Sequence, residues 1–225
     1  MRTWINRTIL TTIAASMLFA CGCSVNFSSR GSAYQLSDFN VGRENFDPES
    51  PELSQRIILL DGGINIESAN TVCKQIIFLN NISKDKPITL WLNSTGGDMT
   101  TYLQIANTIK STPAPVNVVN TGLCASAAIG LMLNATGARY GFADSYFFIH
   151  SCSGGDDELR EKCEEHIEKL LKEKTNIPED WLPLGDAEYT ITSGEALKYS
   201  IIDEVIESYD IFDEPDAQET TTEQL

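Results

Sequence analysis

Hydrophobic residues follow two periodicities between residues 55 and 120. Short apolar runs typical of buried strands occur at 56–60 (RIILL), 87–93 (PITLWLN) and 115–120 (PVNVVN). Between them, apolar residues recur at helical spacing over 66–81 and 96–111. The predicted buried face of the first helix comprises Ile66, Ala69, Val72, Cys73, Ile76 and Ile77. Strands that alternate with helices predict an α/β fold built on a parallel sheet.

The same pattern continues toward the C-terminus. Residues 135–143 and 145–150 have the composition of strands, and residues 156–174 have the pattern of an amphipathic helix. Acidic residues begin this helix and lysines end it, which is the arrangement that the helix dipole favours. His166 lies at the margin of the apolar stripe and is expected on the surface. The stripe itself comprises Leu159, Cys163, Ile167, Leu170 and Leu171.

Polar segments flank this predicted domain, which we place at residues 55–208. Residues 21–54 are rich in Ser, Asn, Asp, Glu and Pro with little apolar periodicity, so they are predicted to form a tether. From Asp203 to Leu225 the chain has nine acidic residues and no Lys or Arg. Residues 209–225 are therefore predicted to be a solvated, disordered tail.

The first twenty residues have the arrangement of a bacterial secretory signal. Arg2 and Arg7 precede an apolar run from about Thr8 to Ala20 that is short for a membrane span. LFAC at 18–21 is similar to a lipobox, so Cys21 is the predicted lipidation site, with Cys23 as the alternative. An ordinary cleaved signal peptide and an uncleaved anchor are the other interpretations. The predicted location is the cell envelope, lipid-anchored and facing the periplasm, or the cytoplasm if this segment is not a signal.

Composition narrows the classes of partner. A net charge of −16 argues against nucleic acid, since phosphate binding needs clustered Lys and Arg. With 42% hydrophobic residues, the chain can bury the core of one domain. Export would place Cys23, Cys73, Cys124, Cys152 and Cys163 in an oxidising compartment. A disulfide is then possible, but the sequence does not reveal which cysteines would pair. No CxxC pair or His cluster occurs, so neither a metal nor another cofactor is predicted.

Three motifs carry residues suited to chemistry. NSTGGD at 93–98 contains Gly96 and Gly97, GLCASAAIG at 122–130 contains Ser126, and FFIHS at 147–151 contains His150. Each lies where a predicted strand ends, which is where α/β folds place their reactive groups. Singly, each motif is equally typical of a turn, a packed helix start or a structural histidine.

In this order and spacing the motifs resemble the proteolytic subunit of the Clp protease family. The closing segment ITSGEALKYSIIDEVI at 191–206 extends the resemblance, which covers about Glu52 to Glu207. The resemblance implies a ClpP/crotonase-like fold of repeated β-β-α units with a parallel sheet and a short protruding handle helix.

The resemblance also implies the roles of individual residues. Ser126 would be the nucleophile and His150 its general base, with the N–H groups of Gly97 and Ala127 forming the oxyanion hole. The catalytic Asp of the family corresponds to Glu188 here, and Asp186, two residues earlier, is the alternative third member. Glutamate can complete such a triad.

The implied function is that of a serine endopeptidase that cleaves peptides or unfolded proteins. The resemblance implies a homo-oligomeric ring, whereas the short segment between His150 and Glu188 argues against a second ring stacked on the first. An exported protein meets no ATP, so an ATP-driven unfoldase is not an expected partner. The alternatives are a catalytically inactive scaffold or binding protein and an acyl-CoA enzyme of the crotonase type.

Overall fold

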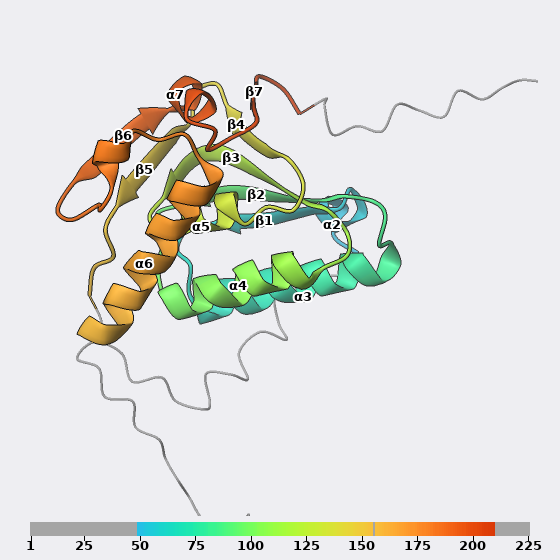
Figure 1. Cartoon of the computed structure of the whole chain (residues 1–225). Helices are drawn as coiled ribbons and strands as arrows, with labels where there is room; N and C mark the ends of the chain where they lie inside the picture. Colours follow the sequence, from blue (N-terminus) through green and yellow to red (C-terminus); the bar gives the residue numbers. More distant parts are fainter. Residues whose placement is uncertain (1–48, 155, 210–225) are drawn as a thin grey trace, which may run out of the picture. The chain divides into compact units, whose positions relative to one another are not determined.

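The computed structural model describes residues 49–154 and 156–209 (Figure 1). The predicted signal 1–20, Cys21, Cys23, most of the tether and the tail beyond residue 209 lie outside these residues. In chain order the elements are α2 (Pro51–Ser54), β1 (Ile57–Asp61), α3 (Ile66–Ile82), β2 (Ile88–Ser94), α4 (Met99–Ser111), β3 (Val116–Ala125), α5 (Ala127–Leu133), β4 (Arg139–Phe142), β5 (Tyr146–His150), α6 (Asp157–Lys174), the 3-10 helix η2 (Glu179–Trp181), β6 (Glu188–Thr192), α7 (Ser193–Lys198) and β7 (Glu204–Ile206).

The sheet has the strand order β1-β2-β3-β4-β7, and every neighbouring pair in this order is parallel. Strand β5 leaves this path and pairs with the C-terminal half of β3, also in parallel, and β6 pairs with β5 antiparallel. Helices α3 and α4 lie side by side along one face of β1 and β2 (Figure 1). The predicted α/β fold with a parallel sheet is confirmed.

Local sequence explains where the helices begin and which face they bury. The Asn65 side chain accepts hydrogen bonds from the backbone N–H groups of Glu67 and Ser68 and so caps α3. Ile77, predicted to be buried, is 53% exposed, because it lies about 100° around the helix from the buried Ile76. Leu159, also predicted to be buried, is 45% exposed because it lies in the first turn of α6, one turn before its buried residues begin.

Residues at both ends of the described chain, which the sequence assigns to the tether and the tail, pack against the domain. Leu53 of α2, inside the predicted tether, is 3% exposed in the core. Arg56 adopts a positive φ of 61°, and its guanidinium donates to four carbonyl oxygens at and beyond the C-terminal end of α3, those of Leu79, Ser83, Lys86 and Pro87. At the other end, Tyr209 stacks on Trp91 of β2.

His166 is half-buried and hydrogen-bonded, not a simple surface residue. Its Nε2 lies 3.0 Å from the Tyr102 hydroxyl, which also accepts a hydrogen bond from Asn134 Nδ2 at 3.0 Å. A Cβ at Gly130 would lie 2.6 Å from the Tyr102 ring, so the ring packs directly on the backbone of α5. One phenol therefore joins α4, α5 and α6. The phenolic hydrogen is available for donation to His166 when the imidazole is neutral.

Acid is expected to weaken this contact. Burial, and then the charges of Lys110 on α4 and Lys169 on α6, lower the pKa of His166. A lowered pKa means that the unfolded chain binds the proton more readily, so the stabilisation is complete above about pH 6.5 and is lost as pH falls through that value toward the folded pKa. We expect the free energy of unfolding to fall more steeply with acid in the wild type than in His166→Gln, measured by urea unfolding at several pH values. Parallel curves for the two proteins would contradict this expectation.

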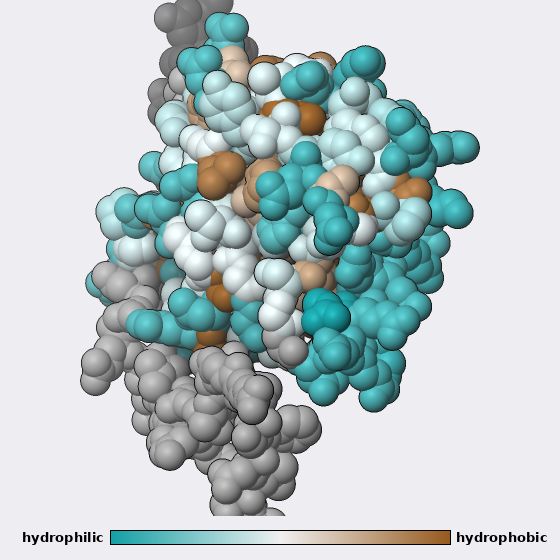
Figure 2. All heavy atoms as spheres, turned by 90° about the vertical axis from the view of Figure 1, so that its left-hand side faces the viewer, coloured by the Kyte–Doolittle hydropathy of each residue, from teal (hydrophilic) through white to brown (hydrophobic). Residues whose placement is uncertain are grey.

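The segment between α6 and β6 folds back on the sheet. Trp181 of η2 stacks on Tyr189 of β6, with ring centroids 3.9 Å apart. Figure 2 faces the side on which α6 and β6 lie in Figure 1, and there hydrophobic residues are scattered among polar ones.

Among the described residues no helix is long and apolar enough to cross a membrane.

Candidate active site

Ser126 occupies a strained turn between β3 and α5. Its φ of 57° and ψ of −126° are rarely adopted by a residue with a side chain. The backbone is held there because Ser126 N–H donates to the carbonyl of Phe148 on β5, at 2.9 Å, while the Ser126 carbonyl accepts from Ile129 N–H inside α5. The hydroxyl makes no capping hydrogen bond. A strained strand-to-helix turn of this kind presents a serine Oγ at the edge of a sheet.

Two glycines hold a second loop against this turn. A Cβ at Gly96 would lie 2.7 Å from the Cβ of Ser126 and 2.9 Å from the amide nitrogen of Ala127. Gly97 has a φ of 152°, and a Cβ there would lie 2.2 Å from the carbonyl oxygen of Ile64. Only glycine fits either position without moving backbone. The loop after β2 therefore packs directly against the Ser126 turn.

Two backbone amides at this junction have no hydrogen-bond acceptor in the part of the chain that the structure describes. Ile64 N–H donates to the Gly96 carbonyl and Asp98 N–H donates to the Ile64 carbonyl, so the N–H of Gly97 itself points away from Ile64. Ala127 is the first residue of α5, so its N–H has no carbonyl partner within the helix. Neither amide donates to another described residue. These are the two amides predicted to form an oxyanion hole.

His150 ends β5, the strand to which the Ser126 turn is hydrogen-bonded. Strand β5 pairs in parallel with β3, and Ala125 is the register partner of Phe148. His150 follows two residues later, next to the turn that carries Ser126. Its ring lies against the Phe148 ring, with centroids 5.1 Å apart. No hydrogen bond joins His150 to Ser126 among the described residues, and such bonds are often long without substrate.

Glu188 lies directly across from His150. The two are register partners in the antiparallel pair of β5 and β6, so their side chains share one face of the sheet. Asp186 lies in the turn before β6 and is exposed. Its charge contributes to raising the pKa of Glu164 on α6, after burial and Glu168, which places Asp186 near the acidic side of that helix. Of the two predicted third members, Glu188 is the one that the register places opposite the histidine.

Comparisons with a family model and with solved structures agree with the resemblance predicted from the sequence. The family model described as Clp protease matches residues 41–209. The chain belongs to the Clp protease family. Among solved structures, ClpP1 from Listeria monocytogenes is 31% identical, with a TM-score of 0.64 over 72% of this chain and 96% of that one. A mutant of the same protein is 32% identical with the same TM-score and coverage. The Clp protease fold supports a serine peptidase.

One residue that positions the site in this Clp protease family member was not predicted. Asn120 is fully buried where β3 stops pairing with β4 and begins pairing with β5. Its Nδ2 donates to the Tyr146 carbonyl at 2.8 Å, and its Oδ1 accepts from Gly122 N–H. The amide thus fills the break between the strands that lead to Ser126 and His150. A polar residue within the apolar run PVNVVN was the available signal.

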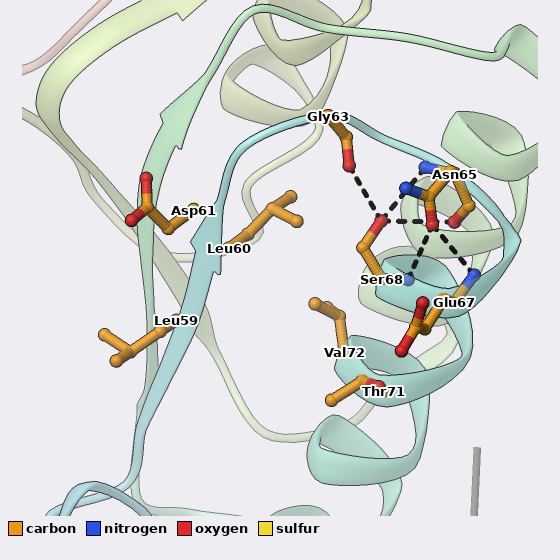
Figure 3. Close-up of a pocket in the computed structure, with 9 residues that line it drawn as sticks. All are labelled: Leu59, Leu60, Asp61, Gly63, Asn65, Glu67, Ser68, Thr71 and Val72. Carbon is orange, nitrogen blue, oxygen red and sulfur yellow. Dashed lines mark hydrogen bonds between the residues drawn. The ribbon is translucent and has the colours of Figure 1, made fainter. Parts of the chain in front are cut away.

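A groove of about 280 Å³ lies away from these residues, between β1 and the start of α3 (Figure 3). Its polar groups are partly paired with one another, since Ser68 Oγ donates to the Gly63 carbonyl and Asn65 caps the helix. None of the predicted site residues of this Clp protease family member lines it. Among the described residues no group of three His, Cys, Asp or Glu side chains could hold a metal, and the four cysteines there are free thiols.

Proposed function

We propose that the chain is a serine endopeptidase of Clp-protease type that cleaves peptides or unfolded proteins as a homo-oligomer. The observation that carries the proposal is the connection between three segments at one edge of the sheet. The strained Ser126 turn is hydrogen-bonded to β5 two residues before His150, and His150 faces Glu188 on β6. Nucleophile, base and orienting carboxylate are therefore neighbours in the order that acyl transfer needs.

The residues would divide the reaction in the following way. Ser126 Oγ attacks the peptide carbonyl carbon while His150 accepts its proton, and Glu188 stabilises the resulting imidazolium. The oxyanion accepts hydrogen bonds from the amides of Gly97 and Ala127. His150 then donates the proton to the leaving amine, which leaves an acyl ester on Ser126. A water molecule, deprotonated by His150, hydrolyses the ester and restores the hydroxyl.

Covalent labelling of the purified full chain with a fluorophosphonate tests the proposal. We expect one adduct by intact mass, mapped to Ser126, with loss of fluoride. Ser126→Ala should take no label, whereas Ser111→Ala, which changes an exposed serine at the end of α4, should label like the wild type. Absence of any adduct on protein that is folded by circular dichroism would instead support the inactive scaffold.

The same assay separates the two acidic candidates. Glu188→Gln is expected to slow labelling about 10²-fold or more, because the amide cannot hold the productive imidazole tautomer or stabilise its charge. Asp186→Asn should label at the wild-type rate. The reverse result would transfer the role to Asp186. Cys21 lies outside the described residues, so the lipid anchor and the envelope location stay predictions.

A further inference from the structure

Phe148 lies beside His150 on the outward face of β5. Side chains alternate along a strand, and Phe147 and Ile149, which are almost completely buried, face the core. Phe148 and His150 therefore share the opposite face, where both are half-buried. Their rings are in contact, with centroids 5.1 Å apart and planes inclined by 35°. This separation lies within the range that aromatic pairs favour.

Packing of the core does not account for the Phe148 ring. Phe148 is not among the half-buried apolar residues that pack against the core of the described domain. Its register partner across β6 is Thr190, which is exposed. Among the described residues the ring that contacts Phe148 is the imidazole of His150. The core thus gives no reason for an aromatic side chain at this position, whereas the contact with His150 does.

The backbone of Phe148 holds the other reacting segment. The Phe148 carbonyl accepts a hydrogen bond from Ser126 N–H at 2.9 Å, and Phe148 is the register partner of Ala125 at the end of β3. Phe148 therefore contacts the Ser126 turn through its main chain and His150 through its side chain. One residue joins the segments that carry the proposed nucleophile and the proposed base.

The imidazole needs such a neighbour because its own torsion holds it loosely. The χ2 torsion of histidine has a broad, roughly two-fold preference. A half-turn about this torsion exchanges the positions of Nδ1 and Nε2, and acyl transfer needs one nitrogen at the serine and the other at the carboxylate. Glu188 lies opposite His150 on β6, and the Phe148 ring lies against the imidazole from β5 itself. Restricting the torsion raises the fraction of productive orientations.

We propose that Phe148 is a positioning residue of the active site, whose ring restricts the His150 imidazole to the orientation in which it accepts the proton of Ser126. This role rests on the proposed function, because it belongs to the same reaction. Phe148 takes no part in making or breaking bonds and acts only through the imidazole. Its removal should therefore slow the chemical step and leave substrate binding nearly unchanged.

Kinetics of the full chain provide the first test. Phe148→Leu keeps an apolar side chain and the backbone hydrogen bond but removes the ring. It should slow fluorophosphonate labelling of Ser126 and lower kcat on labelled casein by about three- to tenfold, the loss expected for one aromatic contact, with little change in KM. Phe148→Tyr, which keeps the ring, should retain the wild-type rate.

Tyr146→Leu is the matched control for the loss of a ring. Tyr146 lies two residues before Phe148 on the same face of β5, is 51% exposed and has no ring contact with His150 among the described residues. The substitution keeps the Tyr146 carbonyl that accepts from Asn120. Tyr146→Leu should therefore label and turn over like the wild type.

Chemical modification of the histidines provides a readout that does not depend on activity. Diethyl pyrocarbonate acylates imidazole nitrogens, and trypsin cleaves between His150 and His166, so mass spectrometry compares the two within one sample. The ratio of modification at His150 to that at His166 should rise about threefold or more in Phe148→Leu, because the ring no longer restricts or covers the imidazole. The ratio should stay at the wild-type value in Phe148→Tyr and Tyr146→Leu.

The two readouts separate the role of Phe148 from the proposed function. An unchanged ratio in Phe148→Leu would overturn the role of Phe148, whether or not labelling slows, because the imidazole would then not depend on the ring. Wild-type labelling and turnover in Phe148→Leu would overturn it too, while the proposed function stands. Absence of label on Ser126 of the wild type would refute the proposed function instead, and the ratio would still show whether the Phe148 ring holds the imidazole.

Discussion

His150→Ala is expected to lower kcat/KM for an unfolded protein such as labelled casein by about 10⁴ to 10⁶. The reason is the position of the His150 imidazole. His150 ends the strand to which the Ser126 turn is hydrogen-bonded, and it faces Glu188. Without the imidazole, the serine hydroxyl has no base to accept its proton. The assay measures initial rates on the full chain at one assembly state, checked by light scattering.

The chain provides its own matched control, because it has only two histidines. His166 lies on α6 and contacts Tyr102, and no hydrogen bond or ring contact among the described residues joins it to a predicted catalytic residue. His166→Gln should therefore keep the wild-type kcat/KM near pH 7.5. If His166→Gln lost activity and His150→Ala kept it, the assignment of the base would be wrong.

Gly97→Ala is expected to lower kcat by about 10² to 10³ with a smaller change in KM. The added methyl group would lie 2.2 Å from the Ile64 carbonyl oxygen, which is backbone and cannot move aside cheaply. The loop must shift, and the amide of Gly97 shifts with it. Because this amide is proposed to bind the oxyanion, its displacement should affect the transition state more than substrate binding.

Gly62→Ala separates this effect from backbone strain. Gly62 also has a positive φ, 102°, but a Cβ there meets no atom within 4 Å. Its replacement should cost about 1–2 kcal/mol of unfolding free energy and leave kcat unchanged. Equal losses of kcat in the two variants would show that strain in the loops, and not the position of the Gly97 amide, controls the rate.

Much of the fold follows from local sequence. The apolar runs of β1, β2 and β3 and the helical spacing of α3, α4 and α6 predict an α/β layer, because strand and helix periodicities differ along the chain. The predictions that were wrong concern residues whose burial depends on packing against another element of the fold. Ile77 and Leu159 are apolar but exposed, and Leu53 is buried inside a segment that looks like a tether. Periodicity identifies an apolar face, but it does not show how far the packing partner extends.

The candidate site likewise contains residues that the sequence predicts and one that it does not. The roles of Ser126, His150, Gly97, Ala127 and Glu188 were predicted from the resemblance to the family, and they stay predictions. Asn120 was missed, because its function depends on β3 changing partners from β4 to β5, and no local pattern reports such a change. The choice between Glu188 and Asp186 stayed open in the sequence, because residues two apart in a strand share a face and only the register of β5 with β6 shows which one lies opposite His150.

The sequence by itself determined the main strands and helices between residues 56 and 174, the order of the predicted nucleophile, base and acid along the chain, and the acidic balance that argues against nucleic acid. Tertiary structure alone decided that Ser126 adopts a strained conformation, that Glu188 rather than Asp186 faces His150, that His166 lies within hydrogen-bond distance of a phenol 64 residues away, and that Tyr209 stacks on Trp91. The physical reason is the range of the forces. Periodicity and capping act over one or two turns, whereas register, strain and aromatic stacking are set by segments that meet only when the chain has folded.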